Sequence, residues 1–332
     1  MKFGNRLTKF LALVTVISLS ALLYGCSQEP GSLPGESETQ SAVNYANNCN
    51  TFVSESDSTV FVSDTTKITA VSKADGSTVE IYSTGTNQYM AIPAFEAFGG
   101  RVYFVTMDSM LYSVAADGTD LQSARLPRGL IIDHNTMVDG YTYDGNLYFV
   151  FDNVSTQSVW QVNENPLSLT EVDASIATKM VTADGSVFVL ETDPATTVTH
   201  LYRQTADGKT EITGAKEAIM SNMITSDENN LFYAAHEVDD MALNVYKVSF
   251  DGSEKTVLAS VPIGMFKYIY YDSENVYIDT FDGVLIFSKE TGRQTDAYTP
   301  DNADFEIADG KIFFYMDGFY ADMQTRQMVR YK

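Results

Sequence analysis

The chain is poor in the residues from which many functional sites are built. Its 332 residues include two cysteines, three histidines and one tryptophan. Two cysteines exclude a disulfide-rich scaffold and any four-cysteine metal site. The 21 lysines and arginines are outnumbered by 44 acids, which gives a net charge of −23. Because nucleic-acid binding needs clustered basic side chains, a nucleic acid is excluded as the expected partner.

Motifs of catalysis and metal binding are missing as well. The histidines His134, His200 and His236 lie far apart and match no ligand spacing. The sequence contains no G-x-S-x-G nucleophile elbow, no C-x-x-C pair and no EF-hand loop. We therefore expect neither an enzyme nor a cofactor. One local acidic cluster is a candidate for holding Ca²⁺: Asp301, Asp304, Glu306 and Asp309.

The chain begins with an export signal. Residues 1–25 carry three bases and no acid, and the apolar run 10–23 spans fourteen residues. As a helix this run measures about 21 Å, short of the roughly 30 Å hydrocarbon core, so it predicts a signal peptide and not a membrane span. The tetrapeptide 23–26, Leu-Tyr-Gly-Cys, resembles the bacterial lipobox. That resemblance implies lipidation at Cys26; the alternative is a plain signal peptide cleaved at another bond.

A polar tether separates the signal from the folded part. Residues 26–44 are rich in Pro, Ser and Glu and hold few apolar side chains, so they cannot bury enough surface to offset their ordering entropy. With Cys26 lipidated, Cys49 has no disulfide partner and is interpreted as a partly buried thiol. We expect a folded domain at 45–332, outside the cytoplasm and held to the cell membrane or envelope by lipid.

A β-rich triplet recurs through the folded part. Its steps are 42, 45, 40, 44, 45 and 36 residues. The seven copies start at Val60, Val102, Leu147, Val187, Leu231, Val276 and Ile312. The six copies from Val102 onward follow a Gly- or Asn-containing turn, and the copies precede an alternating strand, a second turn and a further strand.

Four short antiparallel strands in each repeat are typical of a β-propeller blade. We predict an all-β fold with seven four-stranded blades; six or eight blades are the alternatives. An inner strand near 51–53 belongs to the first blade, so we expect blades one and seven to close the ring by packing face to face. We expect the protein to be a monomer.

The repeats resemble those of the LDL-receptor YWTD type and of DUF5050-like bacterial propellers. Residues 102–108, VYFVTMD, are followed by Leu-Tyr at 111–112 and Asp-Gly-Thr at 117–119, in the order of that repeat. The YWTD tetrapeptide itself is absent, and YWTD receptors have six blades. The resemblance implies a non-catalytic binding propeller without fixed site residues.

One acid occurs at each predicted corner between the second and third strands of a blade. These corner acids are Asp64, Asp108, Asp152, Asp193, Asp239, Asp282 and Asp317. In a propeller, all these corners lie on one face of the ring. One interpretation is structural, because Asp commonly accepts backbone N–H bonds in turns. The other is an acidic mouth that attracts a cation or a basic partner.

Two functions follow from these features. The first is a binding or protein-interaction lipoprotein that presents an acidic face to a protein or peptide ligand. The second is an envelope enzyme, a glycan lyase or hydrolase, that uses carboxylates at the propeller mouth. A pair of carboxylates beside an open central pocket would favour the second.

Overall fold

The computed structural model describes the chain from 52 to 331, within which some short segments are left out. These are 86–90, 133–135, 144, 154–155, 176–178, 183, 207, 238–241, 263, 265, 273 and 300–304. The described residues form seven sheets of four antiparallel strands, each built from four consecutive strands of the chain.

The strands fall into four positions within a blade. The innermost strands are β1 (Val53–Glu55), β5 (Ala94–Phe98), β9 (Met137–Tyr143), β13 (Lys179–Val181), β17 (Glu217–Ser226), β21 (Phe266–Tyr271) and β25 (Glu306–Ala308). The second strands are β2 (Thr59–Ser63), β6 (Arg101–Thr106), β10 (Asn146–Asn153), β14 (Val187–Thr192), β18 (Asn230–Glu237), β22 (Asn275–Thr280) and β26 (Lys311–Phe314). The third strands are β3 (Lys67–Ser72), β7 (Met110–Ala115), β11 (Thr156–Glu164), β15 (Thr199–Thr205), β19 (Ala242–Ser249), β23 (Gly283–Ser288) and β27 (Phe319–Asp322). The outermost strands are β4 (Thr78–Ser83), β8 (Gln122–Arg125), β12 (Leu167–Val172), β16 (Gly208–Glu211), β20 (Lys255–Pro262), β24 (Gln294–Tyr298) and β28 (Met328–Arg330).

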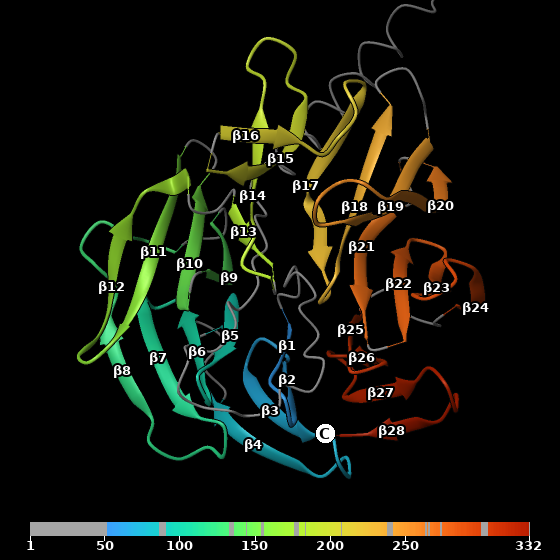
Figure 1. Ribbon diagram of the computed structural model, residues 1–332. Helices are drawn as coiled ribbons and strands as arrows, with labels where there is room; N and C mark the ends of the chain where they lie inside the picture. The colour runs from blue at the N-terminus through green and yellow to red at the C-terminus, as the bar shows by residue number, and fades with distance from the viewer. Residues whose placement is uncertain are drawn as a thin grey trace, which may run out of the picture.

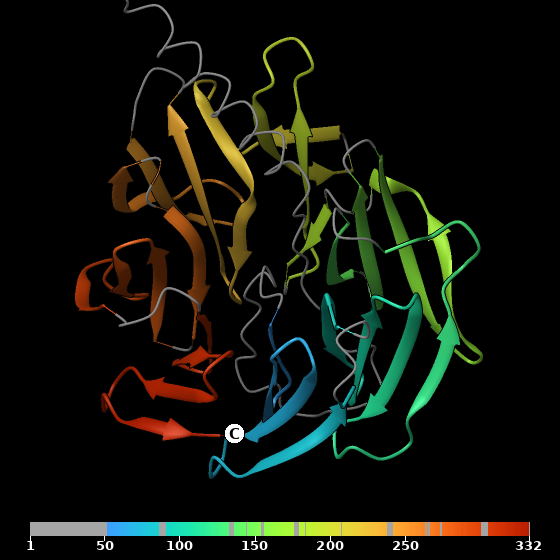
Figure 2. The ribbon, with the colours of Figure 1, turned by 180° about the vertical axis from the view of Figure 1, so that it is seen from behind.

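The seven sheets stand side by side in a closed ring, with their innermost strands toward the middle (Figure 1). The view from behind shows the same order, with the first blade beside the last (Figure 2). The prediction of a seven-bladed all-β propeller is confirmed, and six or eight blades are wrong. Each predicted triplet lies in the second strand of its blade.

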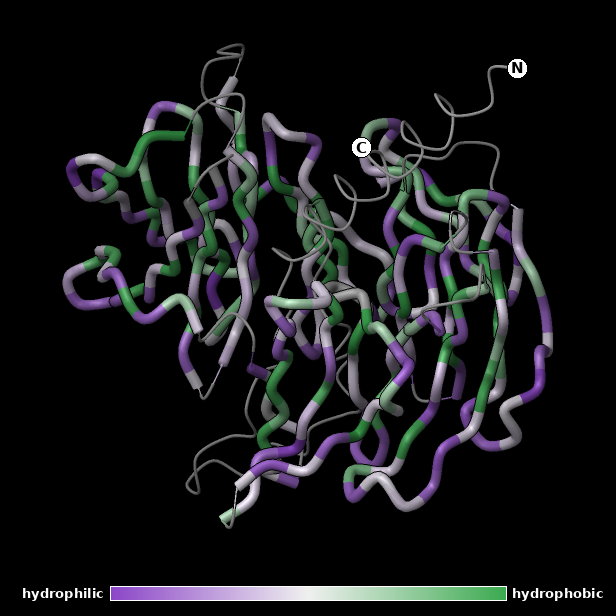
Figure 3. Tube along the Cα trace, turned by 90° about the horizontal axis from the view of Figure 1, so that it is seen from above, coloured by the Kyte–Doolittle hydropathy of each residue, from purple (hydrophilic) through white to green (hydrophobic). Residues whose placement is uncertain are grey.

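The second strands are apolar because both of their faces pack against neighbouring blades. In β6, Val102 and Phe104 pack toward the first blade, whereas Tyr103 and Val105 pack toward the third. Strand interiors are accordingly hydrophobic and the turns hydrophilic (Figure 3). Trp160 packs at the seam between blades two and three.

The ring closes through packing between blades one and seven. Val53 and Val60 of the first blade share one buried cluster with Phe313 and Tyr331 of the last. Each of these two blades is a complete sheet of consecutive strands, so no strand is exchanged to close the ring. The expected closure mode is thus the one observed.

Candidate binding face

One face of the ring carries all the corners between second and third strands. The innermost strands begin at this same face: in blade three, Met137 at the start of β9 pairs with Asp152 at the end of β10. We call it the mouth face. Side chains at the starts of innermost strands and at the ends of second strands therefore meet here, around the ring axis.

Two corner acids hold their own turns together. The Asp64 carboxylate accepts hydrogen bonds from the backbone N–H and hydroxyl of Thr66 and from the N–H of Lys67, at 2.7–2.9 Å. Asp193 accepts the N–H of Ala195 and the hydroxyl of Thr196. These bonds hold the pKa of Asp193 below its usual value, although burial opposes them weakly. Asp64 and Asp193 therefore agree with the structural interpretation, in which the corner acid accepts backbone N–H bonds within its turn.

The remaining corner acids differ from one another. Asp108 accepts a hydrogen bond from the hydroxyl of Thr106 in its own turn. Asp282 and Asp317 are exposed turn residues, and Asp317 donates its own N–H to the Phe314 carbonyl. Asp239 lies outside the described residues.

Asp152 is not a corner residue. It lies within β10, paired with Met137 on one side and Gln157 on the other. Pairing between β10 and β11 continues to Asn153 and Thr156, one residue past Asp152. Burial within the blade raises the pKa of the Asp152 carboxyl.

We expect substitutions of two corner acids, Asp64 and Asp282, to differ in their effect on the free energy of unfolding. Asp64→Ala removes an acceptor of three hydrogen bonds and should lower the free energy of unfolding by about 1–3 kcal/mol, measured by urea unfolding at pH 7. Asp282→Ala, at an exposed corner, is the matched control and should stay within about 0.5 kcal/mol of wild type. Equal losses in both variants would contradict the role of Asp64 in its turn.

Closer to the axis, four further acids lie on inner or second strands. These axial carboxylates are Glu96 on β5, Asp139 on β9, Asp279 on β22 and Glu306 on β25. Sequence reasoning missed them as a set. The sequence pattern that could have identified them is an acidic residue inside an otherwise apolar predicted strand, because acids are rarely buried unless they are paired.

Two axial carboxylates connect neighbouring inner strands. Glu306 accepts the backbone N–H of Phe52 at 3.0 Å, across the seam between blades seven and one. Glu96 accepts the hydroxyl of Ser54 at 3.0 Å, which joins blades one and two. The Glu96 side chain then passes over Gly140, where a Cβ would meet the Glu96 Cβ at 2.8 Å. Gly140 therefore leaves the space on β9 that the Glu96 side chain occupies.

Asp139 is the axial carboxylate without an internal partner. Among the residues that the structure describes, none donates a hydrogen bond to Asp139 and no cation pairs with it. Its side chain keeps partial exposure at the mouth face, yet protein encloses it enough to desolvate the charge. That desolvation, with a smaller contribution from the Asp152 charge, raises the pKa of Asp139 to about 7.

Asp279 lies at the seam between blades six and seven. It is 1% exposed, and its Oδ1 accepts no hydrogen bond from any described residue. Burial raises its pKa to about 7, although the Lys267 ammonium, 3.8 Å from Oδ1, opposes the shift. Burial also raises the pKa of Tyr268 to about 12, with smaller contributions from the charges of Glu306, Asp139 and Asp279 in that order. One phenol on β21 thus lies within electrostatic reach of three axial carboxylates.

Large apolar side chains are exposed on the same face. Four side chains that are 45–65% exposed lie at corners, at the start of β9 or in the connection between β8 and β9: Ile131, Met137, Phe281 and Met316. The other large exposed apolar side chains among the described residues lie on or beside outermost strands: Val79, Leu121, Val257 and Met328. The mouth face therefore combines acids with exposed apolar groups.

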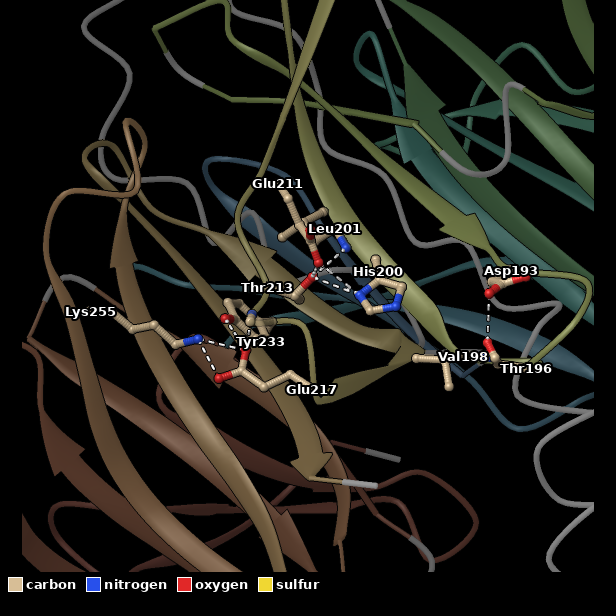
Figure 4. A network of polar contacts seen from close by, with 11 residues as sticks. Asp193, Thr196, Val198, His200, Leu201, Glu211, Thr213, Glu217, Tyr233 and Lys255 are labelled. Atoms are coloured by element: carbon tan, nitrogen blue, oxygen red, sulfur yellow. Dashed lines mark hydrogen bonds and ion pairs between the residues drawn. The ribbon is translucent and has the colours of Figure 1, made fainter. Parts of the chain in front are cut away.

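The two described histidines, His200 and His236, take part in no such arrangement. In blade four, His200 Nδ1 lies 3.0 Å from Glu211 Oε1 and 3.3 Å from the Thr213 hydroxyl (Figure 4). Across the seam in blade five, Glu217 accepts hydrogen bonds from Lys255 and Tyr233 (Figure 4). These contacts fix strands to one another. His236 is half-buried, and burial lowers its pKa.

The candidate Ca²⁺ cluster is divided by the fold. Glu306 and Asp309 lie at either end of β25, and Asp309 pairs with Lys311. Asp301, Asp304, His134, Cys26 and Cys49 lie outside the described residues. Within 52–331, less the omitted segments, no group of three or more His, Cys, Asp or Glu is arranged to hold a metal ion. The same residues contain no helix long and apolar enough to cross a membrane.

Together these features define a seven-bladed propeller with an acidic and apolar mouth face. No protein-family model and no curated protein matches the chain. Among solved structures, an uncharacterized protein from Listeria monocytogenes EGD-e is similar at 12% identity and a TM-score of 0.51, covering 83% of this chain and 91% of its own.

Two enzymes are also among the similar structures. An oligogalacturonate lyase in complex with manganese matches at 11% identity and a TM-score of 0.49, over 76% of this chain and 78% of its own. The tricorn protease matches at 13% identity and a TM-score of 0.47; the match covers 87% of this chain but spans 31% of the protease. At such identities the likeness shows the fold alone, and the resemblance to YWTD and DUF5050-like repeats stays a prediction.

Proposed function

We propose that the protein is a lipid-anchored, extracytoplasmic propeller that binds a basic protein or peptide through its mouth face. The export signal and the lipobox ending at Cys26 support the location and the anchor. Once residues 1–25 are removed, 44 acids remain against 18 bases, so long-range attraction favours a positively charged partner.

The observation that carries this proposal is the exposed apolar set on an acidic face. Phe281 is 63% exposed at the corner between β22 and β23, and Met316 is 53% exposed at the neighbouring corner of blade seven. Water-exposed aromatic and Met side chains are unfavourable on a free surface but are common binding hot spots. Charges around such a hot spot set the rate and the specificity of association.

Crosslinking in intact envelopes, followed by affinity capture, tests this proposal. The wild-type protein should recover one specific partner, and Phe281→Ala should weaken its binding about tenfold or more. Met328→Ala, which is 55% exposed on the outermost strand β28, is the matched control and should bind like wild type. Binding should also weaken as NaCl is raised, because the attraction between exposed charges is screened.

Two results would contradict the proposal. One is repeated failure to recover a specific partner; the other is an equal loss of binding in Phe281→Ala and Met328→Ala. The enzyme alternative has one observation in its favour, because Asp139 and Asp152 form an interacting carboxylate pair near the mouth. Release of products from an envelope glycan, abolished by Asp139→Asn, would favour a lyase or hydrolase over a binding module.

A further inference from the structure

Asp279 is a buried acid whose charge has one cationic partner in the described part of the chain. The side chain is 1% exposed, and its Oδ1 accepts no hydrogen bond from any described residue. The Lys267 ammonium lies 3.8 Å from Oδ1, which is longer than a hydrogen bond. A carboxylate buried in this way depends on its counter-ion, because no described donor compensates for the water that it has lost.

Lys267 connects Asp279 with the exposed Phe281 ring. Its ammonium lies 5.2 Å from the Phe281 ring centroid and 4.9 Å from that of Phe305. Lys267 is on β21 of blade six and Phe305 directly precedes β25 of blade seven, so the ammonium lies at the seam between these blades. The Lys267 side chain is 14% exposed, and the faces of both rings attract its charge. One ammonium therefore joins a buried acid, a buried ring and an exposed ring.

The backbone of this corner is fixed, so the Phe281 side chain is the part that can move. Thr280 pairs with Gly283 across the hairpin, and its hydroxyl donates a hydrogen bond to the Gly283 carbonyl at 2.7 Å. Gly283 has a φ of +138°, and a Cβ there would meet the Tyr298 carbonyl oxygen at 2.5 Å. The turn is thus packed tightly against β24. A change in the position of Lys267 would reach the Phe281 ring through side-chain rotation.

Few other charges act on Asp279. Burial raises its pKa to about 7, and Lys267 is the described charge that opposes this shift. On β21, the Asp279 charge contributes to the raised pKa of both Tyr268 and Tyr270. Glu306 on β25 acts on the same two phenols, and the residue of β23 that pairs with Asp279 is uncharged. Asp279 therefore changes its charge near neutral pH, and Lys267 is the group that responds.

We propose that Asp279 controls the mouth face by holding Lys267 beside the Phe281 ring, and that protonation of Asp279 releases Lys267 and reorients this ring. Once Asp279 is neutral, an ammonium that stayed at the seam would be a buried charge without its counter-ion, so the long side chain turns toward water. The Phe281 ring then loses its cation, and the mouth loses one negative charge. The consequence for binding rests on the proposed function: a basic partner that docks on Phe281 binds more weakly in mildly acidic surroundings.

Fluorine NMR of the full chain, labelled with 4-fluorophenylalanine, tests this coupling without any partner. The Phe281 resonance is identified as the signal that Phe281→Leu removes. Between pH 5 and pH 8 this resonance should shift with a midpoint near pH 7, where Asp279 titrates. The shift should vanish in Asp279→Asn. It should shrink several-fold in Lys267→Met, which keeps a stem of similar length but removes the ammonium.

Two variants that retain Asp279 serve as controls. Asp282→Asn removes an exposed acid from the same corner, and Asp139→Asn removes the other axial acid whose pKa is raised to about 7. Both should keep the wild-type transition of the Phe281 resonance. A Phe281 resonance that does not move with pH, or an unchanged transition in Asp279→Asn, would overturn the coupling.

Partner capture in intact envelopes separates this inference from the proposed function. Recovery by wild type should fall about fivefold between pH 8 and pH 5.5, less than the loss expected for Phe281→Ala, because the ring is displaced and not removed. Asp279→Asn should show the reduced recovery at both pH values. Recovery that depends on Phe281 but is equal at both pH values would overturn this inference alone. A Phe281 transition without any recovered partner would overturn the proposed function alone.

Discussion

Asp139→Asn should make the free protein more stable at pH 8, by about 2–4 kcal/mol. The asparagine keeps the shape of the side chain but removes a charge that burial and Asp152 disfavour. A pKa raised from 3.8 to about 7 corresponds to roughly 4 kcal/mol at most, and partial exposure at the mouth reduces this value. Few substitutions of a candidate binding residue stabilise a protein, so the sign of the effect is informative.

The effect should depend on pH in a defined direction. Between about pH 4 and pH 7 the folded chain retains a proton on Asp139 that the unfolded chain has released, so wild-type stability falls as the pH rises through this range. The advantage of Asp139→Asn should therefore be absent near pH 4 and complete above pH 7. Urea unfolding at pH 4.5, 6 and 8 measures it.

The corner acid Asp193 provides the control for this series. Hydrogen bonds lower the pKa of Asp193, so its charged form is favoured in the folded state and Asp193→Asn should not stabilise the protein at pH 8. A variant Asp139→Asn that is no more stable than wild type at pH 8 would show that the Asp139 charge is already compensated.

Phe313→Ala should destabilise the ring by about 3–5 kcal/mol. Phe313 is fully buried at the seam between blades one and seven, with ring contacts to Tyr320 at 5.4 Å and Tyr331 at 5.9 Å. Deleting a buried phenyl ring removes its transfer free energy and leaves a cavity. Because no exchanged strand holds this seam, closure depends on side-chain packing together with contacts such as the hydrogen bond from the Phe52 N–H to Glu306. Urea unfolding together with limited proteolysis measures the loss.

Phe281→Ala is the matched control for closure. It removes the same phenyl ring from a side chain that is 63% exposed, so its free energy of unfolding should change by about 0.5 kcal/mol or less. If Phe313→Ala were as stable as Phe281→Ala, closure would depend on contacts other than the buried cluster of blades one and seven.

The architecture was predictable because each blade repeats the same physical requirement. A second strand with a blade on either side must be apolar on both faces, which produces triplets such as Val102-Tyr103-Phe104 at a nearly constant step. Turns with positive φ mark the hairpins between them. The number of blades and the order of the strands could therefore be predicted from the sequence.

The candidate site was predictable only in part. Asp64 and Asp193 occupy the corners that the pattern predicts, because the turn itself requires them. Asp152 was placed wrongly, since the length of pairing between β10 and β11 is decided by tertiary contacts and not by turn residues. The burial of Asp139 could not be predicted from the sequence, because Asp152 on β10 and Tyr268 on β21 come near it only in the folded ring.

The direction of β1 determines which way the propeller faces. Val53 pairs with Val62 at the mouth end of β2, so the chain enters the ring from the mouth face. With the proposed lipid on Cys26, the 26 steps from Cys26 to Phe52 could span at most about 90 Å. The proposed anchor would then be joined to the propeller at its acidic face, which anionic headgroups would repel. A ligand would meet it in the narrow space above the lipid, where membrane-bound proteins are concentrated and freely diffusing ones are not.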